Sequence, residues 1–374
     1  GLIWLIVGRA LQGAVTGVIP LGISILRDVL HEDRIDPAIA LISATLGVGG
    51  ALGLPISALV TENADWHALF WTAAVLGAVV FVLVLLVVPV SVLRTAGRFD
   101  YAGALGLAVG LLGILLAISR GDAWGWGSAA TLGCGVGGVA VLLVWGWYEL
   151  RIPEPLLDLR VAARRPVLLT NIASVAMGFS LFSSNVSYPQ LLELPAPTGF
   201  GLTLLAASLV IMPSGLVMMV LSPFSGRLAS TVGPRRLLIL GAIALIAAYG
   251  FSLLLASAVW HILIANLLIG VGIGFGYAAM PMLIMRSVPQ SETGASNGLN
   301  ALFRSLGTSS AAAVVGAVLA SMSSVQDGRT VPTAAAFQVS FWLGLVAAVI
   351  ALTVAAFIPL RPAAEHHPAL PNGH

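Results

Sequence analysis

The chain has 374 residues, of which 59% are hydrophobic and 9% charged, and its net charge is +2. Ordinary soluble chains contain about 45–50% hydrophobic and about 25% charged residues. A soluble fold of this size could not cover its surface with so few charges, and a single cysteine, Cys134, excludes a disulfide scaffold. The arginines are scattered along the chain, unlike the clustered basic face of a nucleic-acid-binding protein. The composition therefore predicts an all-α polytopic membrane protein.

Eleven segments are long and apolar enough to cross a bilayer as helices, which takes about 20 residues. In chain order they cover residues 1–26, 38–60, 68–90, 101–119, 128–148, 167–189, 202–222, 236–257, 261–285, 297–320 and 338–359. None alternates polar and apolar residues as the strands of a membrane barrel do. The first segment lacks the charged start and cleavage site of a signal peptide, so we expect further membrane helices upstream of residue 1.

Arginine is distributed unevenly between the two alternating sets of connections. One set carries Arg27, Arg34, Arg94, Arg98, Arg151, Arg160, Arg164, Arg165, Arg227, Arg235, Arg236, Arg286 and Arg361, and the other carries Arg120 and Arg329. Because cytoplasmic loops are enriched in basic residues, the first set is predicted to be cytoplasmic, with the C-terminus inside. Arg9 and Arg304 remain, both inside predicted spans. A charge in the membrane normally faces the protein interior or a wet cavity.

The first two spans carry motifs of a known transporter family. Arg9, Gln12 and Gly13 lie on adjacent turns of one helix face, and this pattern resembles the fourth-helix motif of the major facilitator superfamily. The second span contains the run Gly47-Val48-Gly49-Gly50-Ala51-Leu52-Gly53-Leu54-Pro55, which resembles the fifth-helix antiporter motif except that Leu54 separates Gly53 from Pro55. Glycines and a proline in this pattern predict a closely packed, kinked helix.

A third motif lies in a predicted cytoplasmic connection. Gly226, Arg227, Gly233, Arg235 and Arg236 match the superfamily's loop motif, although Ser230 and Thr231 stand where that motif has Asp and Arg. The alternative interpretation is a short basic loop without a family role. The segments from Arg27 to Gly47 and from Arg286 to Gly307 also resemble each other. They are separated by an even number of predicted helices, so they indicate either a parallel repeat of transporter halves or a chance similarity.

The runs from Met280 to Met285 and from Asn297 to Gly307 resemble those of fourteen-helix drug:proton antiporters of the actinobacterial type, and the resemblance covers nearly the whole chain. It implies the major facilitator fold, with the eleven predicted spans as helices 4–14 and the first three helices missing. Residues 1–90 would then complete an N-terminal six-helix bundle, residues 91–150 would form a two-helix insert, and residues 151–374 would form the C-terminal bundle with a short polar tail.

The resemblance links Arg9 to proton coupling, whereas the alternative is a structural arginine bound to helix carbonyls. Polar residues also form stripes at helical spacing, which predicts either a lining of the transport pathway or hydrogen bonds between helices. These candidates are Asn297, Asn300 and Arg304 on one span, Asn171, Ser174 and Asn185 on another, and Met280 as an adaptable apolar contact.

The predicted function is that of a secondary active transporter that exports small amphipathic compounds by proton antiport. The alternatives are a metabolite uniporter or symporter, or a membrane protein without transport activity. The sequence contains no metal-binding or phosphate-binding motif, so we expect no enzyme activity and no cofactor beyond the proton gradient. The expected partners are the substrate, protons and lipid. We expect a monomer in the plasma membrane.

Overall fold

The computed structural model describes residues 2–65, 67–88, 100–153, 155–289, 292–326 and 329–359. Within them, eleven helical segments are long and apolar enough to cross a membrane, which confirms the predicted all-α membrane fold. The elements in chain order are α1 (Leu2–Ala14), a 3₁₀ turn η1 (Val15–Gly17), α2 (Val18–Val29), α3 (Glu32–Asn63), α4 (His67–Val87), α5 (Tyr101–Trp124), α6 (Ala129–Glu149), α7 (Leu159–Ala162), α8 (Arg165–Glu193), α9 (Leu204–Val232), α10 (Pro234–Leu254), α11 (Val259–Met285), α12 (Thr293–Ser321), β1 (Ser323–Gln326), β2 (Arg329–Pro332) and α13 (Ala334–Ala356).

The first predicted span is not one continuous helix, because η1 separates α1 from α2. Pro20 has no N–H to donate to the carbonyl of Thr16, so the helical ladder is interrupted at that point. Proline is well tolerated in the first turn of a helix, which is where Pro20 lies in α2. Gly13 and Gly17 further weaken the helix around the break.

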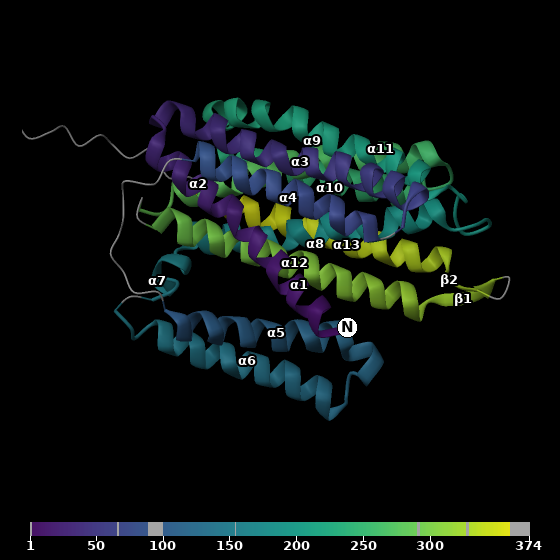
Figure 1. Cartoon of the computed structure of the whole chain (residues 1–374), viewed down its shortest axis with the longest axis horizontal. Coiled ribbons are helices and arrows are strands. Elements are labelled where there is room, and N and C mark those ends of the chain that lie inside the picture. Colours follow the sequence, from purple (N-terminus) through teal and green to yellow (C-terminus); the bar gives the residue numbers. More distant parts are fainter. Residues whose placement is uncertain are drawn as a thin grey trace, which may run out of the picture.

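A short hairpin connects α12 to α13, whereas the sequence analysis predicted no strand. Strands β1 and β2 pair antiparallel, with Ser323 opposite Pro332. The signal for this hairpin is present in the sequence. Asp327 and Gly328 separate the two strands, and an Asp-Gly pair is typical of two-residue hairpin loops. The hairpin lies at the end of the molecule opposite α7 (Figure 1), and the membrane-crossing elements remain helical.

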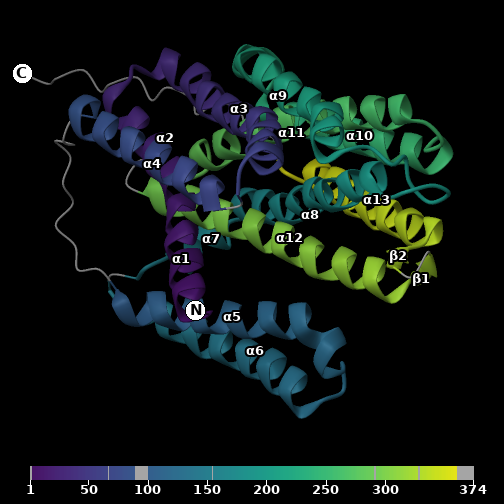
Figure 2. The ribbon, with the colours of Figure 1, turned by 45° about the vertical axis from the view of Figure 1, so that its right-hand side comes forward.

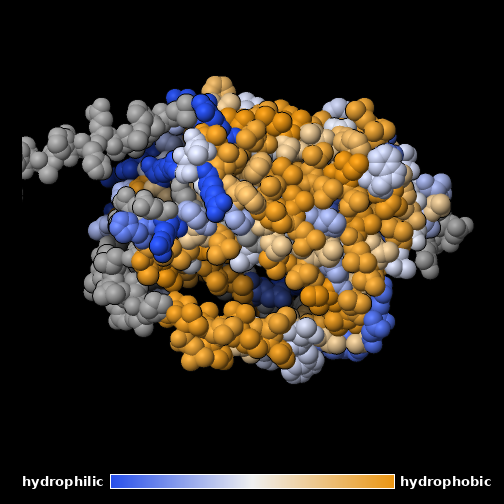
Figure 3. Space-filling view, turned by 90° about the horizontal axis from the view of Figure 1, so that it is seen from above, coloured by the Kyte–Doolittle hydropathy of each residue, from blue (hydrophilic) through white to orange (hydrophobic). Residues whose placement is uncertain are grey.

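Helices α8 to α13 form a bundle, and α3 runs along α9 at its edge (Figures 1 and 2). The α5–α6 hairpin stands below this bundle in both views and faces α12. Large apolar side chains are exposed along α1, α4, α5 and α6. One face of the molecule is accordingly mostly hydrophobic, with hydrophilic side chains gathered toward one end (Figure 3). This is the pattern of helices that contact lipid.

Glycines in close contact with the backbone of the neighbouring helix lie at the four most extensive helix pairings. A Cβ atom added to Gly47 of α3 would lie 2.8 Å from the carbonyl oxygen of Gly215 in α9, and one added to Gly215 would lie 2.6 Å from that of Gly47. Similar reciprocal contacts join α5 to α6 through Gly113 and Gly138, and α10 to α11 through Gly241 and Gly272. Between α8 and α12, Gly178 meets the backbone of Arg304 and Gly307 meets that of Val175. Small residues of this kind let the backbones of membrane helices approach closely.

We expect Gly47→Ala to destabilise the protein by about 1–3 kcal/mol, the usual cost of overpacking a tight contact. The added methyl group would meet the backbone of Gly215 and Met219, which cannot rotate away. The measurement is the thermal denaturation midpoint in detergent, followed by size-exclusion chromatography. The matched control is Gly49→Ala, because a Cβ at Gly49 has no atom within 4 Å. Equal midpoints for the two variants would contradict the role of the α3–α9 contact.

Candidate functional site

A cavity of about 600 Å³ lies where α3 meets the bundle of α8, α9, α11 and α12. Its volume falls within the range of about 300–1,000 Å³ that is common for small-molecule pockets. Most of the lining is apolar, with a few polar groups from different helices. The lining includes Gly49 and Gly53 of α3, Asn185 of α8, Met218 of α9, Tyr277 of α11 and Arg304 of α12.

Arg304 is the charged residue of this cavity lining, as far as the structure describes the chain. Its guanidinium carbon lies 4.7 Å from the centroid of the buried Tyr277 ring, within the range of a cation–π contact. No carboxylate of the described residues lies within 4.0 Å of it. The α12 backbone at Arg304 approaches α8 closely, because a Cβ on Gly178 would lie 2.5 Å from the Arg304 carbonyl oxygen. The fold therefore places a positive charge on an aromatic face beside a mostly apolar cavity.

Four of the predicted site residues form a buried polar cluster where α8, α11 and α12 meet. The Asn300 side chain donates hydrogen bonds to Asn171 Oδ1 at 3.0 Å and to Ser174 Oγ at 2.6 Å. The Ser174 hydroxyl lies 2.9 Å from the sulfur of Met280. Asn297, one turn earlier on α12, donates to the carbonyl of Thr293 at 3.0 Å. The contacts of Asn300 and Ser174 connect helices and the Asn297 bond stays within α12, whereas Asn185 and Arg304 face the cavity described above.

Arg9, Gln12 and Gly13 all lie on the exposed surface of α1, away from the cavity. Arg9 Nη1 donates a 3.1 Å hydrogen bond to Gln12 Oε1, as their spacing on one helix face predicts. Within the described part of the chain, no acidic side chain forms an ion pair with Arg9. The structure therefore brings Arg9 together with Gln12 but not with Arg304.

The glycine run of α3 serves two purposes. Gly47 makes the predicted close approach, against α9, while Gly49 and Gly53 border the cavity with open space where a side chain would stand. Pro55 is buried, and α3 continues through it to Asn63. Bulky side chains at the two bordering positions would occupy the cavity.

The loop motif connects α9 to α10. Gly226 is buried within α9. Gly233 lies between the last residue of α9 and the first residue of α10, and its φ of +87° is a backbone conformation that favours glycine. Arg235 donates from Nε to the Ala355 carbonyl at 3.3 Å and from its terminal nitrogen to the Ala356 carbonyl. The last carbonyls of a helix have no partner within that helix, so Arg235 caps α13. Arg227 and Arg236 are exposed.

A sequence profile of the Major Facilitator Superfamily matches residues 1–312. The chain belongs to this superfamily. It is 29% identical over 254 residues to the lincomycin resistance protein LmrB of Listeria monocytogenes, covering 66% of this chain and 52% of the relative. It is 25% identical over 326 residues to the tetracenomycin C resistance and export protein of Streptomyces glaucescens, covering 85% and 59%.

The multidrug resistance protein Stp of Mycobacterium tuberculosis strain H37Rv is 26% identical over 288 residues, with 76% of this chain and 52% of the relative covered. The chain therefore spans between half and three-fifths of the length of these superfamily relatives. Their names associate them with resistance to antimicrobial compounds or to several drugs and, in one case, with export.

Two contacts of this superfamily member are not evident from its sequence. Tyr277 lies in an almost wholly apolar segment, and no spacing rule pairs it with Arg304, which is on another helix. Asn266 of α11 donates a 2.7 Å hydrogen bond to the Ile211 carbonyl of α9. A lone buried asparagine in an apolar span was the available signal, because such a residue needs a hydrogen-bond partner.

We expect Arg235→Gln to lower the free energy of unfolding by about 1 kcal/mol, because the charged donor to the α13 carbonyls is lost. Amide hydrogen exchange should show faster exchange in the last turn of α13, and the denaturation midpoint should fall. Arg236→Gln removes the same charge from the exposed neighbour and serves as the control. Identical exchange in the two variants would show that Arg235 does not cap α13.

Proposed function

We propose that this protein is part of a secondary active transporter that exports small amphipathic compounds in exchange for protons, by alternating access. The observation that carries the proposal is the cavity of about 600 Å³ between α3 and the α8–α13 bundle, with the Arg304 charge on its wall. A mostly apolar cavity with a few polar groups suits an amphipathic compound. Membership of the superfamily and the names of its relatives support the same function.

In this proposal the chain supplies helices 4–14 of a fourteen-helix protein. Helices α1 to α4 belong to the first half, α5 and α6 form the insert, and α8 to α13 form much of the second half. The two halves rock about the substrate site, as in other transporters built from repeats. The α3–α9 crossing at Gly47 and Gly215 joins the halves beside the cavity. Movement at this contact would open the cavity to one side of the membrane or the other.

Proton coupling in this proposal uses Arg9. A nearby cation favours the ionised form of a carboxylic acid, so Arg9 would hold a partner carboxylate of the full transporter charged until a proton or substrate competes. Gln12 orients the guanidinium through its 3.1 Å hydrogen bond. Arg304 plays a different part, because its charge faces the cavity and positions the polar end of the substrate.

The proposed setting is a monomer in the plasma membrane with the arginine-rich connections in the cytoplasm. A cytoplasm-specific reporter fused after Arg236 should be active, and one inserted within residues 195–200 should be silent. The physical reason is that basic residues are retained on the cytoplasmic side during insertion. The two fusions carry the same reporter and act as controls for each other. The reverse pattern would overturn the orientation.

The transport test uses the full-length protein in energised inverted membrane vesicles with a fluorescent amphipathic dye. Arg9→Ala should abolish proton-driven dye uptake while dye exchange at equal pH persists, because only coupling is lost. Arg9→Lys should restore part of the driven uptake, since lysine keeps the charge but not the planar set of donors. Driven uptake at the parental rate in a well-expressed Arg9→Ala protein would contradict the coupling role.

The same vesicles distinguish the cavity from the coupling site. Arg304→Ala should raise the KM for the dye by about tenfold, which corresponds to about 1.4 kcal/mol. Tyr277→Leu should produce part of this effect by removing the ring beneath the guanidinium. Uptake that does not change when a protonophore dissipates the gradient would favour the uniporter alternative over antiport.

A further inference from the structure

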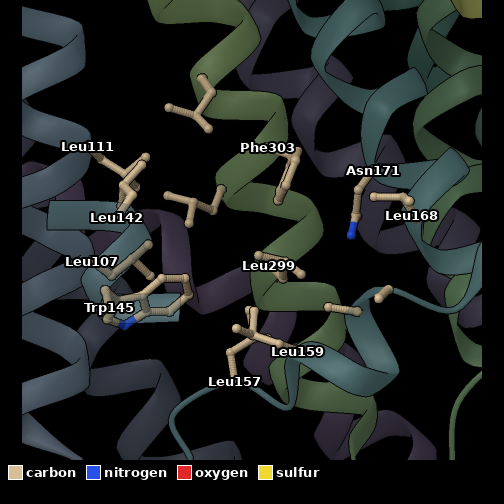
Figure 4. Close-up of a pocket in the computed structure, with 14 residues that line it drawn as sticks. Leu107, Leu111, Leu142, Trp145, Leu157, Leu159, Leu168, Asn171, Leu299 and Phe303 are labelled. Carbon is tan, nitrogen blue, oxygen red and sulfur yellow. The ribbon is translucent and has the colours of Figure 1, made fainter. Parts of the chain in front are cut away.

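A second pocket lies outside the cavity described above, between the α5–α6 hairpin and the bundle. Its volume is about 430 Å³. Figure 4 shows leucines and Trp145 of the hairpin on one side, Leu299 and Phe303 of α12 facing them, and Leu157 and Leu159 below. The polar groups of the lining are the Asn171 amide, whose oxygen accepts a hydrogen bond from Asn300, and the indole N–H of Trp145. The pocket therefore offers van der Waals contacts to an apolar molecule but few hydrogen-bond partners to water.

The hairpin is held together by its own packing, because the Gly113–Gly138 contact brings α5 and α6 close to each other. Toward the bundle it packs chiefly on α12, and the pocket lies at this interface. Apolar walls without a partner atom lose dispersion contacts, and water needs polar partners to occupy such a space. In a bilayer the abundant molecules that fit are acyl chains. The pocket is also partly open, which gives a chain access from the side.

Positive charge lies at one end of the pocket. Helix α7 supplies Leu159 and Ala162 to the lining, and Ala163 follows directly after it. The arginines beside them, Arg160, Arg164 and Arg165, are exposed. None of the three forms an ion pair within 4.0 Å with another residue of the described part of the chain. Their guanidinium groups are therefore available to a phosphate, for which arginine's fork of donors is well shaped.

The acidic groups at this end are less exposed than the arginines, because Asp158 and Glu292 are half-buried and Glu149 is buried. Asp158 accepts hydrogen bonds from the backbone N–H groups of Arg160 at 2.8 Å and Val161 at 3.3 Å. Burial raises the pKa of Glu292, Asp158 raises it further, and Arg164 opposes both. Glu149 is 3% exposed and lines a small pocket of about 110 Å³ together with Asp158 and Arg160. The charge presented to a ligand is therefore mainly that of the arginines.

We propose that this pocket binds one phospholipid with an anionic headgroup. One acyl chain fills the space between the hairpin and α12, and the phosphate contacts Arg160 and Arg164. Basic pockets beside membrane helices are suited to such headgroups. The lipid would attach the α5–α6 hairpin to the bundle. This proposal depends on the membrane location of the chain and not on which compound it transports.

The test measures lipid retention by native mass spectrometry of the full-length protein in mild detergent. Palmitoyl-oleoyl phosphatidylglycerol and the matching phosphatidylcholine are the probes. The protein should retain one phosphatidylglycerol about tenfold more tightly than phosphatidylcholine. Ala163→Phe should reduce retention of both lipids about tenfold, because Ala163 lines the pocket and is exposed enough to accept a larger side chain. Ala108→Phe, on an exposed part of α5 outside the lining, should leave retention unchanged.

The headgroup is tested separately with the double variant Arg160→Gln and Arg164→Gln, which should lose the preference for phosphatidylglycerol but keep phosphatidylcholine binding. Arg120→Gln makes the same kind of charge change at the other end of α5 and should keep the preference. Equal retention in Ala163→Phe and Ala108→Phe would overturn the acyl-chain site. Displacement of the lipid by inorganic phosphate alone would overturn the lipid as ligand, and stoichiometric displacement by a transported dye would assign the pocket to substrate.

Discussion

The architecture depends on backbone-to-backbone approach at glycine. Lipid tails are as apolar as leucine side chains, so membrane helices gain little from burying hydrophobic surface against each other and associate largely through close packing. Here, in each of the four most extensive helix pairings, a glycine of either helix approaches the backbone of the other helix closely. Any side chain at these positions would separate two backbones. The small residues therefore decide which helices are neighbours.

The cavity follows from the same constraint. The Gly47–Gly215 contact holds α3 against α9, and within the next two turns of α3 the open positions Gly49 and Gly53 leave space beside the cavity. The Gly178 contact brings α8 to the α12 backbone at Arg304 and so places the guanidinium over Tyr277. Buried asparagine and serine side chains then connect α8 and α12 through two hydrogen bonds donated by Asn300. The glycine contacts and the hydrogen bonds thus favour the same arrangement of α8 and α12 beside the cavity.

Charge is distributed in a way that separates structural from candidate functional roles. Arg235 is engaged with helix carbonyls, whereas Arg304 faces a cavity and Arg9 is an exposed group oriented by Gln12. Burying a charge without a partner is costly, and the aromatic face of Tyr277 reduces that cost without neutralising the charge. A positive group kept available in this way is suited to a transient partner. The exposed arginines near α7 suit a lipid headgroup for the same reason.

The sequence alone determined the membrane class, the number of spans and the superfamily motifs, because the bilayer fixes how long an apolar segment must be. It also predicted that Arg9 and Gln12 share a face, since their spacing is local. Two further features had local signals in the sequence: Pro20 for the break at η1 and the Asp-Gly pair for the β1–β2 hairpin. The signal of Pro20 was hard to recognise because it lies inside a long apolar run. Tertiary structure alone decided the Arg304–Tyr277 contact, the pairing of Gly47 with Gly215 and the pocket beside α7. Helices such as α4 and α11 are apolar around most of their circumference, so no periodicity shows which face packs against which neighbour. That choice is made between residues far apart in the chain, through the fit of their backbones.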